Sequence, residues 1–146
     1  VREVLGTIDV DPASNEIAQE TVLASRFLTQ KDDGLKFPWK GKVWCNPPYS
    51  ISLLRKFCTY FANEYSNGNM EEGIILTNSG TDTLWNQSLI LGTQAYTVGR
   101  ISFIRPDGIE KGKGGRGQVF TYFGPDDSKF IEVFTRDKFC WVPNRK

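Results

Sequence analysis

The tetrapeptide Asn46-Pro47-Pro48-Tyr49 constrains the fold more than any other part of the chain. It follows a short apolar run at residues 42–45 and precedes a stretch, from Ser50 onward, whose apolar residues recur at helical spacing. Each proline lacks an amide N–H and has a fixed φ, so neither a strand nor a helix continues through the pair. The pattern therefore predicts a strand, a rigid turn and a helix. Open α/β sheets place their ligand crevices at such carboxyl ends of strands.

The residue types in this turn suit chemistry at a planar nitrogen. An exocyclic amine such as adenine N6 is a weak nucleophile because its lone pair is delocalised into the ring. The Asn46 side-chain oxygen and the Pro47 carbonyl could accept hydrogen bonds from its two N–H groups, while Tyr49 stacks on the base. Methyl transfer from S-adenosylmethionine would then depend on positioning and need no strong base. A plain turn is the simpler alternative, and a protein glutamine, whose carboxamide nitrogen is also planar, would fit the same loop.

The composition is typical of a globular protein and excludes several kinds of chemistry. We expect one domain over residues 1–146, in a cytoplasmic setting, because no run could span a membrane and no signal segment begins the chain. The sequence has no histidine, which excludes His-dependent triads and the usual zinc sites. The three cysteines, Cys45, Cys58 and Cys140, lack metal-binding spacing, so we expect no metal and interpret Cys45 as a buried strand residue.

Positive charge is concentrated in the last third of the chain. Residues 1–99 hold eight Lys and Arg against eleven Asp and Glu, whereas residues 100–146 hold ten against six. A polyanion such as DNA is expected to meet that end. The Gly-rich loop carrying Lys111, Lys113 and Arg116 is either a solvated loop or a contact with nucleic-acid phosphates.

Acidic side chains mark two candidate cofactor loops. Residues 4–14 are predicted to form a strand that ends in Asp9, Asp11 and a Pro12-Ala13-Ser14 turn, with Ser14 capping a helix over residues 15–24. The carboxylates could accept hydrogen bonds from the ribose hydroxyls of S-adenosylmethionine or pair with its ammonium group. Asp33, in the turn at residues 30–35, could accept a hydrogen bond from the cofactor's adenine amine. The alternatives are that Asp11 only caps the helix and that Asp33 is a solvated surface charge.

The remaining periodicity predicts an α/β protein. A helix is expected over residues 51–66, a buried strand over residues 73–78, and a polar loop and helix after it. Thr81, Asp82 and Trp85 in that loop and helix are candidates for the target-base pocket. Strands are then expected near residues 94–98, 100–104 and 118–123, with a loop at 107–117 that makes a hairpin, followed by a helix within residues 126–141.

Taken in order, these segments resemble the phage-type DNA N6-adenine methyltransferase family. The resemblance runs from about residue 5 to about residue 124 and rests on the ordered motifs Ile8-Asp9-Val10-Asp11-Pro12-Ala13-Ser14, Asp33-Gly34-Leu35, Val43-Trp44-Cys45-Asn46-Pro47-Pro48-Tyr49-Ser50, Thr81-Asp82-Thr83-Leu84-Trp85 and Gly99-Arg100-Ile101-Ser102-Phe103. It implies a Rossmann-like fold with a mostly parallel sheet and a C-terminal antiparallel hairpin, S-adenosylmethionine as methyl donor, and adenine in DNA as acceptor, in a bacterial or phage-infected cell. It also implies catalytic roles for Asn46 to Tyr49, and cofactor contacts at Asp9, Asp11 and Asp33. Asn46 is also a candidate cofactor contact. A glycine-rich cofactor loop and a separate target-recognition domain are missing.

Several alternatives stay open at this point. The acceptor could be adenine in RNA or a protein glutamine, or the chain could be a catalytically silent nucleic-acid-binding module. If the acceptor is duplex DNA, the adenine must be flipped out of the stack, which costs a few kcal/mol. Because the chain is small, it could form a homodimer, act with a partner protein or prefer single strands.

Overall fold

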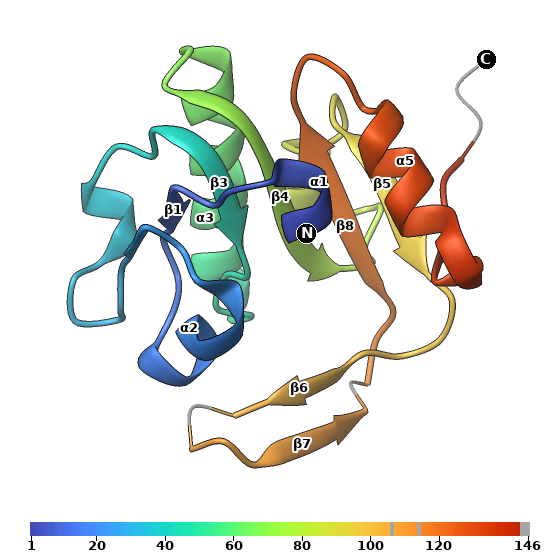
Figure 1. The fold of residues 1–146 in the computed structure, drawn as a ribbon, viewed down its shortest axis with the longest axis horizontal. Coiled ribbons are helices and arrows are strands. Elements are labelled where there is room, and N and C mark those ends of the chain that lie inside the picture. Colours follow the sequence, from blue (N-terminus) through green and yellow to red (C-terminus); the bar gives the residue numbers. More distant parts are fainter. Residues whose placement is uncertain (106, 114, 144–146) are drawn as a thin grey trace.

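The structure is a computed structural model that describes residues 1–105, 107–113 and 115–143. Its main feature is a seven-stranded sheet in the order β2-β1-β3-β4-β8-β5-β9, and a two-stranded ribbon of β6 and β7 lies outside it (Figure 1). The helices are α1 (Arg2–Leu5), α2 (Glu16–Val22), α3 (Ile51–Ser66), α4 (Leu84–Gln87) and α5 (Ser128–Thr135), with 3-10 turns η1 (Gly34–Lys36) and η2 (Arg136–Lys138). The strands are β1 (Val10–Asp11), β2 (Arg26–Phe27), β3 (Gly41–Cys45), β4 (Met70–Asn78), β5 (Thr93–Thr97), β6 (Ser102–Ile104), β7 (Glu110–Lys113), β8 (Gln118–Phe123) and β9 (Cys140–Trp141).

The sheet is parallel in its first half and antiparallel in its second. Strands β2, β1, β3 and β4 run in the same direction, whereas β8, β5 and β9 join through antiparallel pairs. Asn78 at the end of β4 lies opposite Gln118 at the start of β8. The carboxyl ends of β1, β3 and β4 therefore share one border of the sheet with the start of β8, which we call the carboxyl edge.

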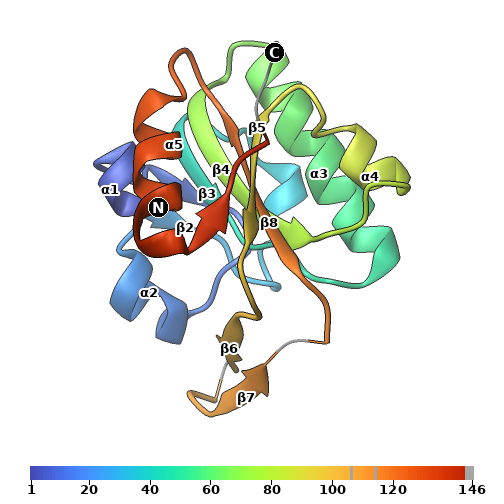
Figure 2. The same ribbon diagram turned by 90° about the vertical axis from the view of Figure 1, so that its right-hand side faces the viewer.

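Helix α3 covers one face of the sheet together with α4 (Figure 2). Its buried residues Leu54, Phe57, Cys58 and Phe61 recur at helical spacing and form one apolar stripe. The fit to the sheet is close: a Cβ on Gly73 of β4 would lie 2.9 Å from the Phe61 ring, so only glycine admits the helix at this distance. The long buried run in β4 matches a strand covered on both faces, as predicted.

Helices α1 and α5 cover the opposite face (Figure 2). Phe130 and Phe134 of α5 are buried, and their rings lie 5.4 Å from Tyr122 and 4.7 Å from Phe120 of β8, respectively. These aromatic contacts place the C-terminal helix on the antiparallel half of the sheet.

Three sequence-based expectations need correction. The predicted strand over residues 4–14 is a helix at its start, because Leu5 packs inside the core beneath α5, and only Val10–Asp11 is strand. Asn15, not Ser14, caps α2: its side chain accepts a hydrogen bond from the Ala18 amide at 3.0 Å. The parallel arrangement expected for most of the sheet is found only among β2, β1, β3 and β4.

The C-terminal hairpin is also arranged differently from the prediction. Strand β8 pairs with β5, whereas residues 100–104 contribute β6, which pairs with β7 inside the segment expected to be a loop. Glycine and charged residues obscured the strand character of β7 because they are depleted in strands.

Replacing Phe61 by alanine tests the importance of the α3 contact with the sheet. The Phe61 side chain is fully buried against Trp39 and Phe123, so Phe61→Ala should lower the free energy of unfolding by about 3 to 5 kcal/mol. Urea denaturation followed by circular dichroism measures the change. Leu91→Ala, at an exposed position, should stay within about 0.5 kcal/mol of the parent chain. Equal effects at the two positions would contradict this account of the core.

Candidate active site at the carboxyl edge of the sheet

The Asn46–Tyr49 loop leaves β3 at the carboxyl edge and leads directly into α3. Pro47 is buried and Pro48 is exposed, so the loop is held on one side by the core. In the part of the chain that the structure describes, no hydrogen bond is made to the Pro47 carbonyl oxygen. That oxygen and the half-buried Asn46 side chain are two acceptors one residue apart on a rigid turn.

Tyr49 folds back over the loop and closes it. Its hydroxyl lies 3.2 Å from the Asn46 Oδ1, 3.3 Å from the Gln118 Oε1 and 3.4 Å from the Leu76 carbonyl oxygen. Burial raises the pKa of Tyr49 well above its usual range, so the hydroxyl keeps its proton and donates. The Asn46 oxygen has two lone pairs and retains one for a ligand N–H when it accepts from Tyr49.

Polar residues of β4 and β8 extend this network across the sheet. The Gln118 Nε2 donates to the Asn78 Oδ1 at 3.0 Å, and its Oε1 faces the Tyr49 hydroxyl. Gln118 is nearly fully buried, and its side-chain amide is hydrogen-bonded to both Asn78 and Tyr49, as expected for a buried polar group. Neither Asn78 nor Gln118 was predicted to belong to the site, although polar residues at the ends of two expected strands were a usable signal.

The ribbon also reaches this loop. The Phe103 ring of β6 lies 5.8 Å from the Tyr49 ring in an edge-to-face arrangement, at an interplanar angle of 66°. This contact was not predicted, because residues 100–104 were expected to belong to the main sheet. It places the base of the ribbon beside the catalytic candidate.

Asp11 ends β1 and lies at the same edge, but its carboxyl group points into the protein. Its oxygens accept from the Ala13 amide at 3.3 Å and from the Gln19 Nε2 at 2.9 Å. Gln19 also donates to the Ser14 hydroxyl at 2.7 Å, so the Pro12–Ser14 turn is tied to α2. With Asp11 only 2% exposed, burial raises the pKa of its carboxyl group to about 6.

Asp33 belongs to a second turn that packs on the first. Its backbone has a φ of 59°, and its side chain accepts from the Leu35 amide at 3.3 Å and pairs with Lys36 at 3.5 Å. A Cβ on the neighbouring Gly34 would lie 1.9 Å from the Pro12 carbonyl oxygen. The structure therefore brings Asp33 beside the Asp11–Ser14 turn, with a half-exposed carboxylate.

Asp9 directly precedes β1, and its carboxylate faces the start of β3. Its Oδ2 accepts from the Lys42 amide at 2.8 Å, at the amino end of β3, while Asn46 follows the carboxyl end of that strand. Asp9 therefore pairs with the backbone of the neighbouring strand, at a distance from the Asn46–Tyr49 loop.

The candidates after β4 divide into exposed and buried residues. Thr81 and Asp82 are exposed in the loop that leaves the carboxyl edge, close to the end of β4. Trp85 is buried in α4 and packs in the core with α3, and a Cβ on Gly80 would lie 2.9 Å from its ring. The Trp85 side chain thus packs between the core and the loop that carries Gly80, Thr81 and Asp82.

The basic candidates belong to the ribbon and its return to the sheet. Lys111 and Lys113 are part of β7, and their side chains lie outside the described part of the structure. Arg116 is exposed, and its carbonyl oxygen accepts from the Gln118 Nε2 at 3.3 Å. Arg116 therefore lies two residues from the network around Tyr49.

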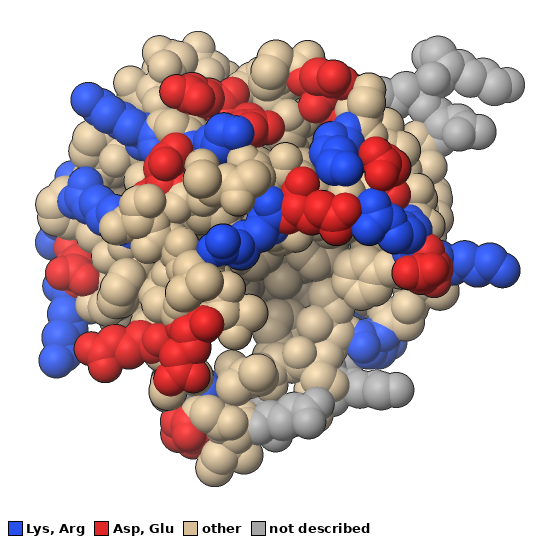
Figure 3. Space-filling view, in the orientation of Figure 1, with Lys and Arg blue, Asp and Glu red and all other residues tan. Residues whose placement is uncertain are grey.

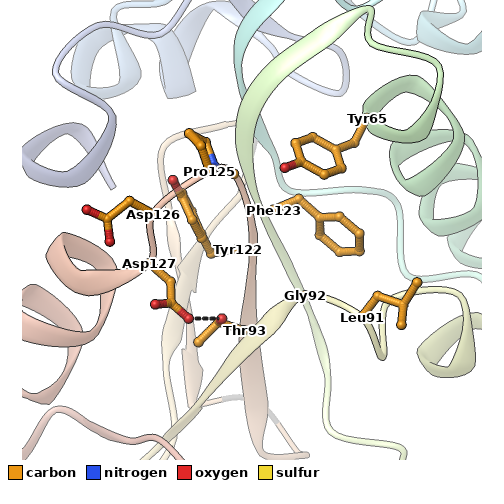
Figure 4. A pocket seen from close by; sticks show the side chains of 10 residues that line it. Tyr65, Leu91, Gly92, Thr93, Tyr122, Phe123, Pro125, Asp126 and Asp127 are labelled. Atoms are coloured by element: carbon orange, nitrogen blue, oxygen red, sulfur yellow. Dashed lines mark hydrogen bonds between the residues drawn. The ribbon is translucent and has the colours of Figure 1, made fainter. Parts of the chain in front are cut away.

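A cavity of about 320 Å³ lies at the other end of the sheet, between Tyr65, Phe123 and Asp127 (Figure 4). Phe123 ends β8 opposite Gly73, near the start of β4, so the cavity is far from Asn46. Among the described residues, no group of three or more acidic, cysteine or histidine side chains could hold a metal ion. No helix in that same part of the chain is long and apolar enough to cross a membrane.

Cys45 precedes the Asn46 loop but is not suited to act as a nucleophile. The residue is fully buried, as predicted, and burial raises the pKa of its thiol well above the usual range. The reactive thiolate would therefore be scarce at neutral pH.

The fold and the site together define a mixed α/β protein whose acceptor-rich loops converge at the carboxyl edge of a sheet. A family model described as DNA N-6-adenine-methyltransferase (Dam) matches residues 3–138. The chain belongs to this family, which confirms the resemblance seen in its motifs. The family description implies an enzyme with DNA as its substrate. A search among curated proteins found none that matches the chain.

The raised pKa of Asp11 predicts a pH dependence of stability. The unfolded carboxyl group titrates near 3.8 and the folded one near 6, so between these values the folded state binds more protons. Stability should therefore fall as pH rises through this window, by about 3 kcal/mol from this group. Asp11→Asn removes the contribution, so the stability of the variant relative to the parent should improve between pH 4 and pH 7.

Denaturant unfolding at both pH values measures this difference. Asp82→Asn is the matched control because the Asp82 side chain is exposed. If the relative stability of Asp11→Asn changed no more with pH than that of the control, the buried carboxyl would not titrate as described.

Proposed function

We propose that this chain transfers the methyl group of S-adenosylmethionine to N6 of adenine in DNA, within a Rossmann-like methyltransferase domain spanning residues 1–146. The observation that carries the proposal is the pair of acceptors at Asn46 and Pro47, held beside Tyr49 at the carboxyl edge. The family to which the chain belongs supports the choice of adenine in DNA.

The two acceptors act on the amine of the target base. The Asn46 Oδ1 and the Pro47 carbonyl oxygen accept the two N6–H groups, draw the nitrogen away from planarity and aim its lone pair. Both oxygens are fixed in advance by the prolines and by Tyr49, so little reorganisation is needed at the moment of transfer. The amine loses a proton to solvent after the new N–C bond forms. No histidine or other strong base is required for this step.

The donor groups of the cofactor match the acceptors at the same edge. When bound, S-adenosylmethionine supplies an electrophilic methyl group on a sulfonium whose leaving group is neutral. Its ribose hydroxyls and adenine amine are hydrogen-bond donors, and the half-exposed Asp33 carboxylate is available to accept from them. Asp11 holds the Pro12–Ser14 turn against Gly34 and so shapes the place where the cofactor lies. Asp9 takes no part in this proposed site.

The target base enters from the opposite side of the Asn46 loop. Thr81 and Asp82 are exposed in the loop that follows β4, the strand next to β3, and Tyr49 offers an aromatic ring next to the Asn46 oxygen. An adenine flipped from a duplex loses its stacking, and contact with the Tyr49 ring restores part of it. Trp85 contributes by supporting the loop from the core.

The central test is Asn46→Ala. Removing the side-chain oxygen takes away one of the two acceptors, so transfer of labelled methyl groups to mixed-sequence DNA should fall at least about 100-fold. The modified nucleoside should be N6-methyladenine. The exposed Asn67→Ala is the matched control and should retain the activity of the parent chain.

Two measurements accompany this test. Cofactor binding by calorimetry should persist in Asn46→Ala, which would show that the fold and the cofactor loops survive. Transfer that continues unchanged in this variant would remove the loop from the mechanism. Label appearing in RNA or in glutamine, and not in DNA, would reassign the substrate.

A separate prediction concerns the contact between the two cofactor turns. A methyl group on Gly34 cannot coexist with the Pro12 carbonyl oxygen at 1.9 Å, so Gly34→Ala must push the turns apart. We expect the affinity for S-adenosylmethionine to fall by about tenfold or more, a loss of about 1.4 kcal/mol. Gly115→Ala, where a Cβ would meet nothing within 4 Å, should bind like the parent. Unchanged binding in Gly34→Ala would place the cofactor elsewhere.

A further inference from the structure

The Tyr49 hydroxyl carries one proton but faces three oxygen atoms. The Asn46 Oδ1 lies 3.2 Å away, the Gln118 Oε1 3.3 Å and the Leu76 carbonyl oxygen 3.4 Å. Burial raises the pKa of Tyr49, so the phenol stays neutral and has a single O–H group to donate. The three oxygens therefore compete for one donor, and rotation of the O–H group about the C–O bond decides which of them accepts.

The Gln118 side chain has its oxygen turned toward Tyr49 by two contacts of its nitrogen. The Nε2 donates to the Asn78 Oδ1 at 3.0 Å and to the Arg116 carbonyl oxygen at 3.3 Å, which engages both of its N–H groups. Because a backbone carbonyl oxygen can only accept, the nitrogen must lie on the Arg116 side and the Oε1 on the Tyr49 side. Gln118 is only 3% exposed, so water has little access to that oxygen.

The backbone of Gln118 is held in place by the sheet. Gln118 begins β8 opposite Asn78 at the end of β4, and the Thr97 hydroxyl of β5 lies 3.3 Å from both its amide nitrogen and its carbonyl oxygen. The Gln118 oxygen is therefore fixed relative to three strands, whereas Asn46 and Tyr49 belong to a loop.

The contacts around Tyr49 join neutral groups only, namely side-chain amides, a phenol and backbone carbonyl oxygens. The surface just above the ribbon is hollowed, and tan, uncharged residues line the hollow (Figure 3). The Phe103 ring of the ribbon lies 5.8 Å from the Tyr49 ring, so an aromatic side chain borders the network there. Hydrogen bonds between neutral groups are weaker than charge-assisted ones, so a stronger donor can displace the Tyr49 hydroxyl from Asn46.

We propose that Gln118 is a positioning residue, which accepts the Tyr49 hydrogen bond when the amine of the target base binds to Asn46. The inference rests on the proposed function and gives Gln118 a part in it. In the free protein, the Tyr49 hydroxyl donates to the Asn46 Oδ1 and holds that side-chain amide in place. When an N6–H group of the base donates to the same oxygen, the Tyr49 O–H group turns to the Gln118 Oε1, and its covalent bond stays intact. The Asn46 oxygen is then left to the base.

This exchange matters most during methyl transfer. As the new N–C bond forms, the amine nitrogen gains positive charge, so its N–H groups become charge-assisted donors. An Asn46 oxygen that is not shared with Tyr49 stabilises this charge better than a shared one. Interactions that strengthen only in the transition state raise kcat and leave KM nearly unchanged. Gln118 is therefore expected to act on kcat, through the Tyr49 hydroxyl.

The test is a double-mutant cycle of Gln118→Met and Tyr49→Phe. The first change keeps the length of the side chain and removes its oxygen, and the second keeps the ring and removes the hydroxyl. The matched control is Gln94→Met, because the Gln94 Oε1 also accepts from a tyrosine hydroxyl, that of Tyr96, at 2.8 Å. The values of kcat and KM for methyl transfer to DNA are measured for each chain, with cofactor affinity by calorimetry and folding by circular dichroism.

We expect each single variant to lose about tenfold in kcat, while KM and cofactor affinity stay within about threefold of the parent chain. Two independent losses would multiply to about 100-fold, whereas losses through one hydroxyl do not. The double variant should therefore stay within about threefold of the slower single variant. Gln94→Met should match the parent chain.

A further variant, Gln118→Glu, separates the oxygen acceptor from the packing and serves where Gln118→Met fails to fold. In this buried position a carboxyl group keeps its proton, because desolvation and the two facing oxygens disfavour the ionised form. Its O–H then replaces an amide N–H, and its carbonyl oxygen still accepts from Tyr49. Since one hydrogen bond is lost, kcat should stay within about threefold of the parent value.

An unchanged kcat in Gln118→Met or in Tyr49→Phe would overturn the proposal, and so would losses that multiply in the double variant. A folded Gln118→Glu chain that loses as much as Tyr49→Phe would do the same. If the parent chain transfers no methyl group to DNA, the proposed function fails and this inference fails with it. If the parent chain is active and the losses multiply, only the role of Gln118 fails.

Discussion

The buried side chain of Trp39 is the interaction on which the candidate site depends. Its indole Nε1 donates to the Gly34 carbonyl at 2.9 Å, and its backbone amide donates to the Glu64 Oε2 at the same distance. The rings of Phe57, Tyr60 and Phe61 in α3 surround it. Trp39 thus connects the Gly34 turn to the helix that begins directly after the Asn46–Tyr49 loop. Because tightly packed interiors deform little, the two sides of the site keep a fixed separation.

Much of the frame could be predicted from sequence. The doubled proline after an apolar run located β3 and the start of α3, and the continuous run at residues 73–78 located the buried part of β4. These signals are local, because proline geometry and hydrophobic periodicity act within a few residues. The placement of Asn46 and Tyr49 at the end of a strand followed from the same signals.

The rest depends on contacts between distant residues. Leu5 is helical because α5, more than a hundred residues away, covers it. Asp9 and Asp11 look equivalent in sequence, yet the Asp9 carboxylate accepts from the Lys42 amide of β3 and the Asp11 carboxylate accepts from Gln19 of α2. The pairing of β5 with β8 could not be read from spacing, because the β6–β7 segment separates them in the chain. The link from Tyr49 to Gln118 spans 69 positions and has no local signature.

The position of the ribbon has a consequence for how such a chain can change over evolutionary time. Residues 98–117 connect two strands that already pair, so the ends of this insertion stay adjacent whatever its length. Closing a longer loop costs little, about 0.6 kcal/mol for each doubling of its length. Insertions, deletions and exchanges can therefore accumulate in the ribbon while the sheet and the Asn46 loop stay intact. The ribbon can therefore vary in length and sequence, whereas the Asn46 loop is constrained by the reaction that we propose for it.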